Sequence, residues 1–232
     1  MKRLILSLLL AAPAFSQIAA WSSASGNNSA TLSGCATHHA YFVVANVSNT
    51  NYSGALLGTT IISSTSISSG NWTAGTERRD TSGGGADTQL FYAYSASIGD
   101  SETIGVSGGN NPDISAQCYS GVQSTSPLDK EVEGDGGWGT SMQLSVSPGR
   151  NGELLVFGCS AQSVNTTLSI ASGFTIATSS STTGEPGCLA YLIQTTAATA
   201  SPTLSGWNFP SGSLMSFKAA AVSISIGFGI VM

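Results

Sequence analysis

Short motifs recur along this chain at an interval of about one hundred residues, and this repeat constrains the fold more than any other feature. Gly70-Asn71-Trp72-Thr73 has a counterpart in Ser172-Gly173-Phe174-Thr175. Leu90-Phe91-Tyr92-Ala93-Tyr94 likewise has one in Gly187-Cys188-Leu189-Ala190-Tyr191. The aligned positions are Trp72 and Phe174, Tyr92 and Ala190, and Cys118 and Phe217, at offsets of 102, 98 and 99 residues. A nearly constant offset predicts two similar halves, at about residues 35–125 and 140–218.

Runs of β-branched and aromatic residues alternate with clusters of Gly, Ser, Asn and Pro, which is typical of short strands joined by turns. The predicted strands are 41–47, 56–62, 90–97, 102–106, 115–122, 141–146, 153–159, 168–170, 188–195, 203–207 and 214–217. No stretch after the first sixteen residues has a sustained helical period. We therefore predict an all-β fold, an antiparallel two-sheet β-sandwich of the jelly-roll or immunoglobulin-like type.

The first half also carries Gln117-Cys118-Tyr119-Ser120-Gly121-Val122 and Ser126-Pro127-Leu128-Asp129. The order of these motifs resembles bacterial and phage surface or secreted β-sandwich modules. Those modules run from Gly-Trp-Thr through an aromatic strand to Tyr-Ser/Arg-Gly-Val and Ser-Pro-hydrophobic-Asp. The resemblance covers residues 41–218 and implies an extracellular sandwich for surface display, adhesion or glycan contact, without catalytic residues. The four cysteines and the tail after Lys218 depart from it.

The N-terminus has the three parts of a secretory signal peptide. Lys2 and Arg3 form a basic start, Leu4–Ala12 an apolar core, and Ala14-Phe15-Ser16 a small-x-small cleavage site. The apolar core is too short for a bilayer span, which needs about 20 residues. We expect residues 1–16 to be removed, with no transmembrane anchor retained, and the protein to be extracellular or on a cell surface. The sandwich would then occupy residues 17–218 and a strand or tail residues 219–232.

The charge balance disfavours nucleic-acid binding. The formal net charge is −5, and loss of Lys2 and Arg3 makes it −7. Phosphate recognition needs clustered lysine and arginine, which the rest of the chain lacks. The hydrophobic fraction of 41% is sufficient for a packed core, while the 8% of charged residues predicts a surface of Ser, Thr, Asn and Gly.

The cysteines form an even set in a chain with a signal peptide, which predicts disulfides. They are Cys35, Cys118, Cys159 and Cys188. Three pairings are open. We favour Cys159 with Cys188, since both lie in apolar strands of the second half, and Cys35 with Cys118 in the first. Zinc is the weaker interpretation, because no Cys-x-x-Cys spacing exists and the histidines are the neighbours His38 and His39.

The acidic run from Asp129 to Asp135 is the best candidate for ligand chemistry. Its carboxylates are Asp129, Glu131, Glu133 and Asp135. Alternating carboxylates with a glycine at the sixth place are similar to the start of a calcium loop, although Thr140 stands where a bidentate Glu is needed. We favour a solvated acidic loop between strands, with calcium binding as the alternative. We therefore expect no cofactor, calcium being the one exception that the sequence leaves open.

Glycan contact would need exposed aromatic faces. Trp138 lies in a glycine-rich loop beside the acidic run, and we expect it to be exposed and to bind a ligand together with Asp129 and Tyr119. Trp72 matches Phe174 in the repeat, so core packing is expected for it. Trp207 and Tyr52 are further aromatic candidates.

The tail alternates apolar and small residues from Val222 to Met232, which is a strand pattern. One interpretation is a last strand that completes a sheet. The other is a strand that pairs with another copy of the chain, giving self-association.

We expect a secreted, non-catalytic surface, adhesive or structural module that contacts a glycan or a surface protein through its loops. The nucleophile-elbow pattern at Gly105–Gly109 is not followed by a helix signal, and no serine, histidine and acid are tied together by the sequence. The alternative is a secreted glycan-active hydrolase that uses loop carboxylates such as Glu131 or Glu133.

Overall fold

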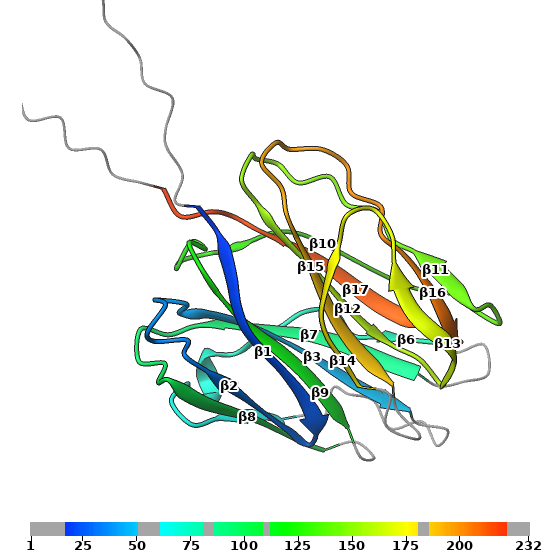
Figure 1. Ribbon diagram of the computed structural model, residues 1–232, viewed down its shortest axis with the longest axis horizontal. Coiled ribbons are helices and arrows are strands. Elements are labelled where there is room, and N and C mark those ends of the chain that lie inside the picture. The colour runs from blue at the N-terminus through cyan, green and yellow to red at the C-terminus, as the bar shows by residue number, and fades with distance from the viewer. Residues whose placement is uncertain (1–16, 51–60, 81–85, 109–111, 181–185, 222–232) are drawn as a thin grey trace, which may run out of the picture.

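The computed structural model of the protein describes residues 17–50, 61–80, 86–108, 112–180 and 186–221 (Figure 1). Over these ranges the chain is almost all β, every strand pairing is antiparallel, and a short 3-10 turn, η2 (Ser69–Asn71), precedes β5. The first half contributes β1 (Ala19–Asn27), β2 (Ser29–Ser33), β3 (Phe42–Thr50), β4 (Ile61–Ser64), β5 (Thr73–Ala74), β6 (Arg78–Arg79), β7 (Ala86–Tyr94), β8 (Ser101–Ser107) and β9 (Asp113–Ser120). The second half contributes β10 (Leu128–Asp135), β11 (Ser141–Gln143), β12 (Leu154–Ser160), β13 (Ser163–Ile170), β14 (Thr175–Ser180), β15 (Gly187–Ile193), β16 (Thr203–Asn208) and β17 (Ser211–Phe217). Within the described ranges, no helix is long and apolar enough to cross a membrane.

The two halves have the same topology. In the first, a wide sheet of order β1-β9-β3-β7-β5, with β6 also on β7, faces a three-stranded sheet of order β2-β8-β4. In the second, the wide sheet is β10-β17-β12-β15-β14 and the narrow one is β11-β16-β13. In each half the first strand pairs with the last, the second with the last but one, and the third with the strand before that. This is the pairing of a jelly roll, whereas the first strand of an immunoglobulin domain lies beside the second. The predicted antiparallel sandwich with two similar halves is confirmed.

The repeated motifs occupy equivalent places in the two sandwiches. Trp72 and Phe174 each stand directly before an edge strand, β5 and β14. Tyr92 and Ala190 lie on the matching strands β7 and β15, and Cys118 and Phe217 on β9 and β17. The first sandwich also includes β1 and β2, which no predicted strand covered. The predicted strand at 56–62 falls mostly outside the described residues.

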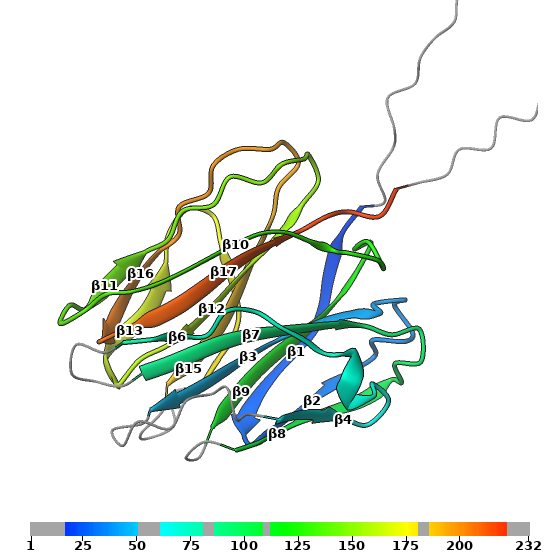
Figure 2. The same ribbon diagram turned by 180° about the vertical axis from the view of Figure 1, so that it is seen from behind.

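Three buried clusters divide the molecule into layers. Each sandwich has an apolar core between its own two sheets, and a third cluster lies between the two wide sheets. Figures 1 and 2 show the narrow sheets on the outside and the wide sheets facing each other. In the middle layer, Phe217 packs against Phe42 and Tyr92, with ring centroids 4.9 and 5.1 Å apart. The two sandwiches therefore share one continuous apolar interface.

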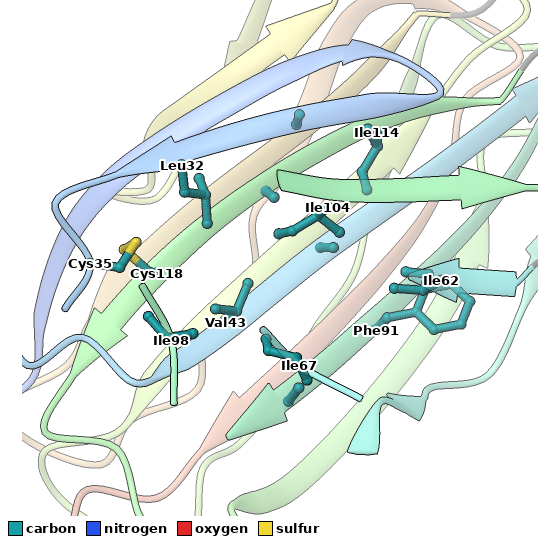
Figure 3. Close-up of a cluster of buried hydrophobic side chains, with 14 of the residues drawn as sticks. Leu32, Cys35, Val43, Ile62, Ile67, Phe91, Ile98, Ile104, Ile114 and Cys118 are labelled. Carbon is teal, nitrogen blue, oxygen red and sulfur yellow. A yellow bond between two sulfur atoms is a disulfide. The ribbon is translucent and has the colours of Figure 1, made fainter. Parts of the chain in front are cut away.

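Both predicted disulfides are present. Cys35 is bonded to Cys118 on β9, inside the core of the first sandwich, where Figure 3 shows them near Leu32 and Ile98. Cys159 is bonded to Cys188, which lies directly opposite it on the neighbouring strand. Each bond thus links segments of a single sandwich.

The wide sheets approach closely where β3 crosses β12 and β15. The fully buried Asn46 donates from Nδ2 to the carbonyl oxygens of Cys159, at 2.9 Å, and Cys188, at 3.1 Å. Its Oδ1 accepts from the hydroxyl of Thr88 at 2.7 Å. Glycine allows this approach, because a Cβ on Gly158 would lie 2.5 Å from Asn46 Oδ1. A buried amide with its hydrogen bonds made thus joins the two sandwiches.

The edges of the wide sheets contact each other reciprocally. On one side β1 lies against β14, and Ser23 Oγ donates to the carbonyl of Ala177 at 2.9 Å. On the other side β10 lies against β6, and Arg78 forms an ion pair with Asp135. β10 is the counterpart of β1, and β6 follows β5, the counterpart of β14, along the same edge of β7. In the two contacts the first and the second sandwich therefore exchange roles. This reciprocity is that of a two-fold interface between identical subunits, here formed within one chain.

Candidate functional site

An aromatic strip lies on the surface of the first sandwich, and it is defined by Trp21, His38, His39, Tyr41 and Tyr94. Trp21 is stacked on His38 with ring centroids 3.8 Å apart, and its Nε1 donates to the hydroxyl of Ser120 at 3.0 Å. His39 Nδ1 and Tyr41 Oη are 3.0 Å apart, and Tyr41 meets Tyr94 edge-to-face at 6.4 Å. Trp21 is 40% exposed and Tyr94 37%. The strip therefore exposes Trp21, His38, His39 and Tyr94 to solvent, while Tyr41 lies half-buried against the core.

The turn that carries the two histidines is fixed from several sides. His39 donates its backbone N–H to the carbonyl of Ala36 at 3.0 Å, and the neighbouring Cys35 is held by its disulfide. The carboxylate of Asp100 accepts from the backbone N–H and the hydroxyl of Thr37, at 2.7 and 2.8 Å. These two hydrogen bonds lower the pKa of Asp100, with His38 adding to the effect. A turn held in this way presents its rings at a reduced ordering cost on binding.

A groove of about 330 Å³ begins at Tyr94, where the strip ends. It runs between the β5–β7 edge of the first sandwich and the connection to β10. Its polar and aromatic lining consists of Asn71, Thr73, Tyr92, Tyr94, Ser124 and Ser126. Asn71, Ser124 and Ser126 are exposed, so an amide and two hydroxyl groups stand beside an aromatic ring. A sugar ring offers the matching surface, with an apolar face and a rim of hydroxyls.

The phenol of Tyr92 lies at the inner end of the groove and is neutral at physiological pH. Tyr92 is nearly buried, and burial raises the pKa of its phenol, while a hydrogen bond with Thr73 opposes the rise and the charge of Glu131 adds to it. A neutral phenol can both donate and accept a hydrogen bond. Tyr92 is therefore a polar contact at the base of the groove over the whole physiological pH range.

The predicted ligand-binding residues do not come together. Trp138 is exposed as expected, at 75%, and meets Phe209 edge-to-face at 5.3 Å in the turn after β10. Tyr119 is fully buried, with its hydroxyl donating to Gln117 at 2.7 Å, so its proposed contact with a ligand is wrong. Asp129 follows the groove residue Pro127 by two positions, and its Oδ2 accepts from the backbone N–H of Gly149 at 2.8 Å. Tyr52 lies outside the described residues.

The acidic run is a strand, and the expectation of a loop is wrong. Residues 128–135 form β10, which pairs with β17 along its length. Glu131 accepts from the backbone N–H of Thr76 at 2.6 Å, and Asp135 bonds both Arg78 and the N–H of Gly137. Glu131 and Asp135 therefore attach the second sandwich to the β5–β6 segment of the first.

This geometry does not assemble a calcium site on β10. Side chains two residues apart on a strand are separated by about 6.5–7 Å along its axis, whereas calcium draws its oxygens to within about 2.5 Å of the ion. In the described part of the chain, no three His, Cys, Asp or Glu side chains gather where they could hold a metal ion. Glu133 is exposed, and no group of metal-ligating side chains in the described part of the chain includes it.

Sequence reasoning missed the strip because its members come from separate segments. His38 and His39 are both exposed in the turn between β2 and β3. Tyr94 ends a strand that is otherwise buried, and Trp21 lies on a strand that was not predicted. The available signal was the spacing of Tyr92 and Tyr94, which are two residues apart and therefore lie on the same face of β7. Tyr92 is buried in that strand, whereas Tyr94 lies at its end and reaches solvent.

Comparison of the chain with models of protein families, with curated proteins and with solved structures found no match. Its function must therefore be inferred from the chemistry of the site itself.

Proposed function

We propose that the protein is an exported, non-catalytic surface module that contacts glycans through the Tyr94 groove and the aromatic strip. The observation that carries the proposal is the groove, in which an exposed tyrosine stands among amide and hydroxyl groups. Export is supported by the signal-peptide pattern and by two disulfides, which persist in oxidising compartments.

The groove supports binding better than catalysis. Hydrolysis of a glycosidic bond needs two carboxyl groups that face each other across the bond. The charge of the Glu131 carboxylate acts on Tyr92, but this carboxylate already accepts hydrogen bonds from Thr76. Among the described residues, none of those that line the groove is Asp or Glu. A glycan seated there would be held by stacking and hydrogen bonds without an acid or a nucleophile beside it.

A glycan array probed with the mature, oxidised protein tests the proposal. We expect specific binding that Tyr94→Ala weakens about tenfold or more, since one aromatic contact is worth roughly 1–3 kcal/mol when lost. Asn71→Ala should weaken it further by removing an amide. Trp138→Ala is the matched control, because it removes an exposed ring outside the groove, and binding should be unchanged.

The other outcomes are equally informative. Loss of binding in Trp138→Ala with Tyr94→Ala unaffected would move the site to the turn after β10. Loss in chelator would point to a calcium ion, which the separated carboxylates of β10 do not favour. Release of free sugar from any array glycan would overturn the non-catalytic proposal.

A further inference from the structure

The second sandwich has an apolar groove along one side. It lies between the edge strands β13 and β14, has a volume of about 470 Å³, and is lined by Val164, Thr166, Leu168, Ile176 and Trp207, among others. Val164 is 45% exposed and Ile176 37%, which is unusual for large aliphatic side chains. Trp207, only 2% exposed, forms the floor. Apolar side chains are therefore exposed to solvent at the side of this sandwich where its two sheets separate.

The first sandwich is filled at the corresponding place. There the segment from Thr65 to Trp72 runs between β4 and β5, contains η2, and places Ile67 and Trp72 against the core. The second sandwich has only Ala171–Phe174 between β13 and β14. The groove is thus the gap that the shorter connection leaves open.

The groove is also bordered by an unpaired strand edge. β13 pairs with β16 on one side, and in the described part of the chain no strand lies on its other side. The pairing of β13 with β16 is itself interrupted between Val164 and Ser169. An added strand could bond the free backbone groups of β13 and cover the apolar lining at the same time.

We propose that the segment Val222–Met232 of one copy adds as a strand to β13 of a second copy and packs its apolar face into this groove. In that segment Val222, Ile224, Ile226, Phe228 and Ile230 alternate with Ser and Gly. A strand with this pattern presents a continuous apolar face to the groove and small residues to solvent. Its length of eleven residues exceeds the eight residues of β13, so it can follow the whole edge.

The geometry favours a second copy over the chain's own tail. The apolar pattern starts at Val222, directly after the last described residue, with no linker before it. In both views the red end of the coloured chain lies on the opposite side of the molecule from β13 (Figures 1 and 2). A strand that lies along β13 uses eight residues, about 26 Å, which leaves three residues, about 10 Å, to cross the molecule.

Each copy then offers one tail and one groove, so the contact joins different surfaces on the two partners. Such a contact either closes into a ring, of which a reciprocal exchange of tails between two copies is the smallest, or propagates into an open filament. In the open form the protein becomes a fibre of identical units. This assembly is independent of the glycan contact, since the groove beside β13 shares no lining residue with the Tyr94 groove.

Sedimentation of the full mature chain over a wide range of concentration tests the proposal. We expect a series of species larger than the monomer. Ile226→Lys in the tail and Ile176→Lys in the groove should each weaken self-association roughly tenfold to a hundredfold, because a charge would enter an apolar contact. Ser225→Lys, on the other face of the tail, and Thr140→Lys, exposed elsewhere on the second sandwich, are the matched controls and should leave assembly unchanged.

A cysteine pair identifies the source of the strand. A chain that carries both Ile176→Cys and Ile226→Cys should, on oxidation, give a ladder of covalent multimers. A disulfide-linked monomer would show that the tail folds onto its own groove and would overturn the proposal. A chain that stays monomeric at every concentration, or an assembly that both lysine variants leave intact, would overturn it as well. All variants can be checked for folding by their thermal transition. Ile176 and Thr140, the two substituted positions in the described part of the chain, lie outside the buried clusters.

Discussion

At the scale of single residues, five carboxyl groups in the described part of the chain are buried, and three of them, those of Asp87, Asp113 and Glu153, have a shifted pKa. Burial raises the pKa of each of these three. The effect is largest for Asp87, whose pKa rises from 3.8 to about 7, with Arg79 opposing the rise and Glu77 adding to it. Between these two values the folded protein binds a proton that the unfolded chain releases. The free energy of unfolding therefore falls as pH rises through this window.

We expect Asp87→Asn to raise the melting temperature at pH 7–8 and to leave it nearly unchanged at pH 4. The amide resembles the protonated carboxyl, so the variant should also show a weaker pH dependence between pH 4 and 7. Each kcal/mol regained corresponds to about 2–4 °C for a domain of this size. Thermal melts from pH 4 to 8 provide the measurement.

Asp100→Asn is the control with the opposite sign. Hydrogen bonds from Thr37 lower the pKa of Asp100, so its contribution to stability is present above the pKa of the unfolded chain and is lost on acidification. Asp100→Asn should therefore lower the melting temperature at neutral pH and not at acidic pH. A parallel response of both variants would contradict the assignment of Asp87.

Single-residue predictions from the sequence succeeded where local context decides. Trp138 is exposed because a glycine-rich turn offers no core to enter. Tyr119 was misplaced because its environment depends on Tyr191, which packs against it from the other sandwich, 5.9 Å between ring centroids. Contacts between distant segments leave no trace in the spacing of nearby residues.

At the scale of elements, the crossing of β3 and β12 depends on a missing side chain. Gly158 lies against Asn46 and Leu90, and a Cβ there would be 2.5 and 2.7 Å from their side-chain atoms. The amide of Asn46 cannot move away without breaking its bonds to two carbonyl groups of the facing sheet. The spacing between the wide sheets is therefore set at this point.

We expect Gly158→Ala to lower the free energy of unfolding by about 1–3 kcal/mol, since one added methyl group forces a packed interface apart. Gly70→Ala is the matched control, because no atom lies within 4 Å of the added Cβ and its effect should be small. Denaturant titration of both variants measures the difference. Equal stability of the two would show that the sheets are held elsewhere.

β10 shows why an element can be missed. Charged residues are depleted from strands in general, so a run with four carboxylates indicated a loop. An edge strand tolerates them, because one of its sides has no neighbouring strand and charges there discourage further pairing. The apolar signals of β10, Leu128 and Val132, were too few to reveal it.

At the scale of the whole molecule, the two sandwiches share the middle cluster of buried side chains. Phe42 and Leu90 of the first half pack in it with Val156 and Leu189 of the second. Separation would expose this surface and break the hydrogen bonds of Asn46. Neither half can therefore lose its structure without uncovering an apolar face of the other.

We expect a single cooperative thermal transition, with equal calorimetric and van't Hoff enthalpies, for the oxidised protein. Gly158→Ala should shift this transition to lower temperature without splitting it. Differential scanning calorimetry provides both quantities. Two resolved transitions would mean that the halves are independent domains.

The sequence predicted the duplication but not how the copies pack. The repeat offset follows from motifs that each half needs for its own sandwich. The contact between the wide sheets instead depends on small and polar residues such as Asn46, Ser48 and Gly187, which look like surface residues when read singly.

The reciprocal packing also affects the order of the halves along the chain. Gly121, which follows the last strand of the first sandwich, accepts from Ala220 at 2.8 Å and passes close to Gln17. The passage from the first sandwich to the second and the two ends of the described chain thus lie together. Joining residue 221 to residue 17 through a short peptide and opening the chain near Ser124 would give a circular permutant in which the second sandwich comes first. In such a circle, either sandwich can serve as the beginning.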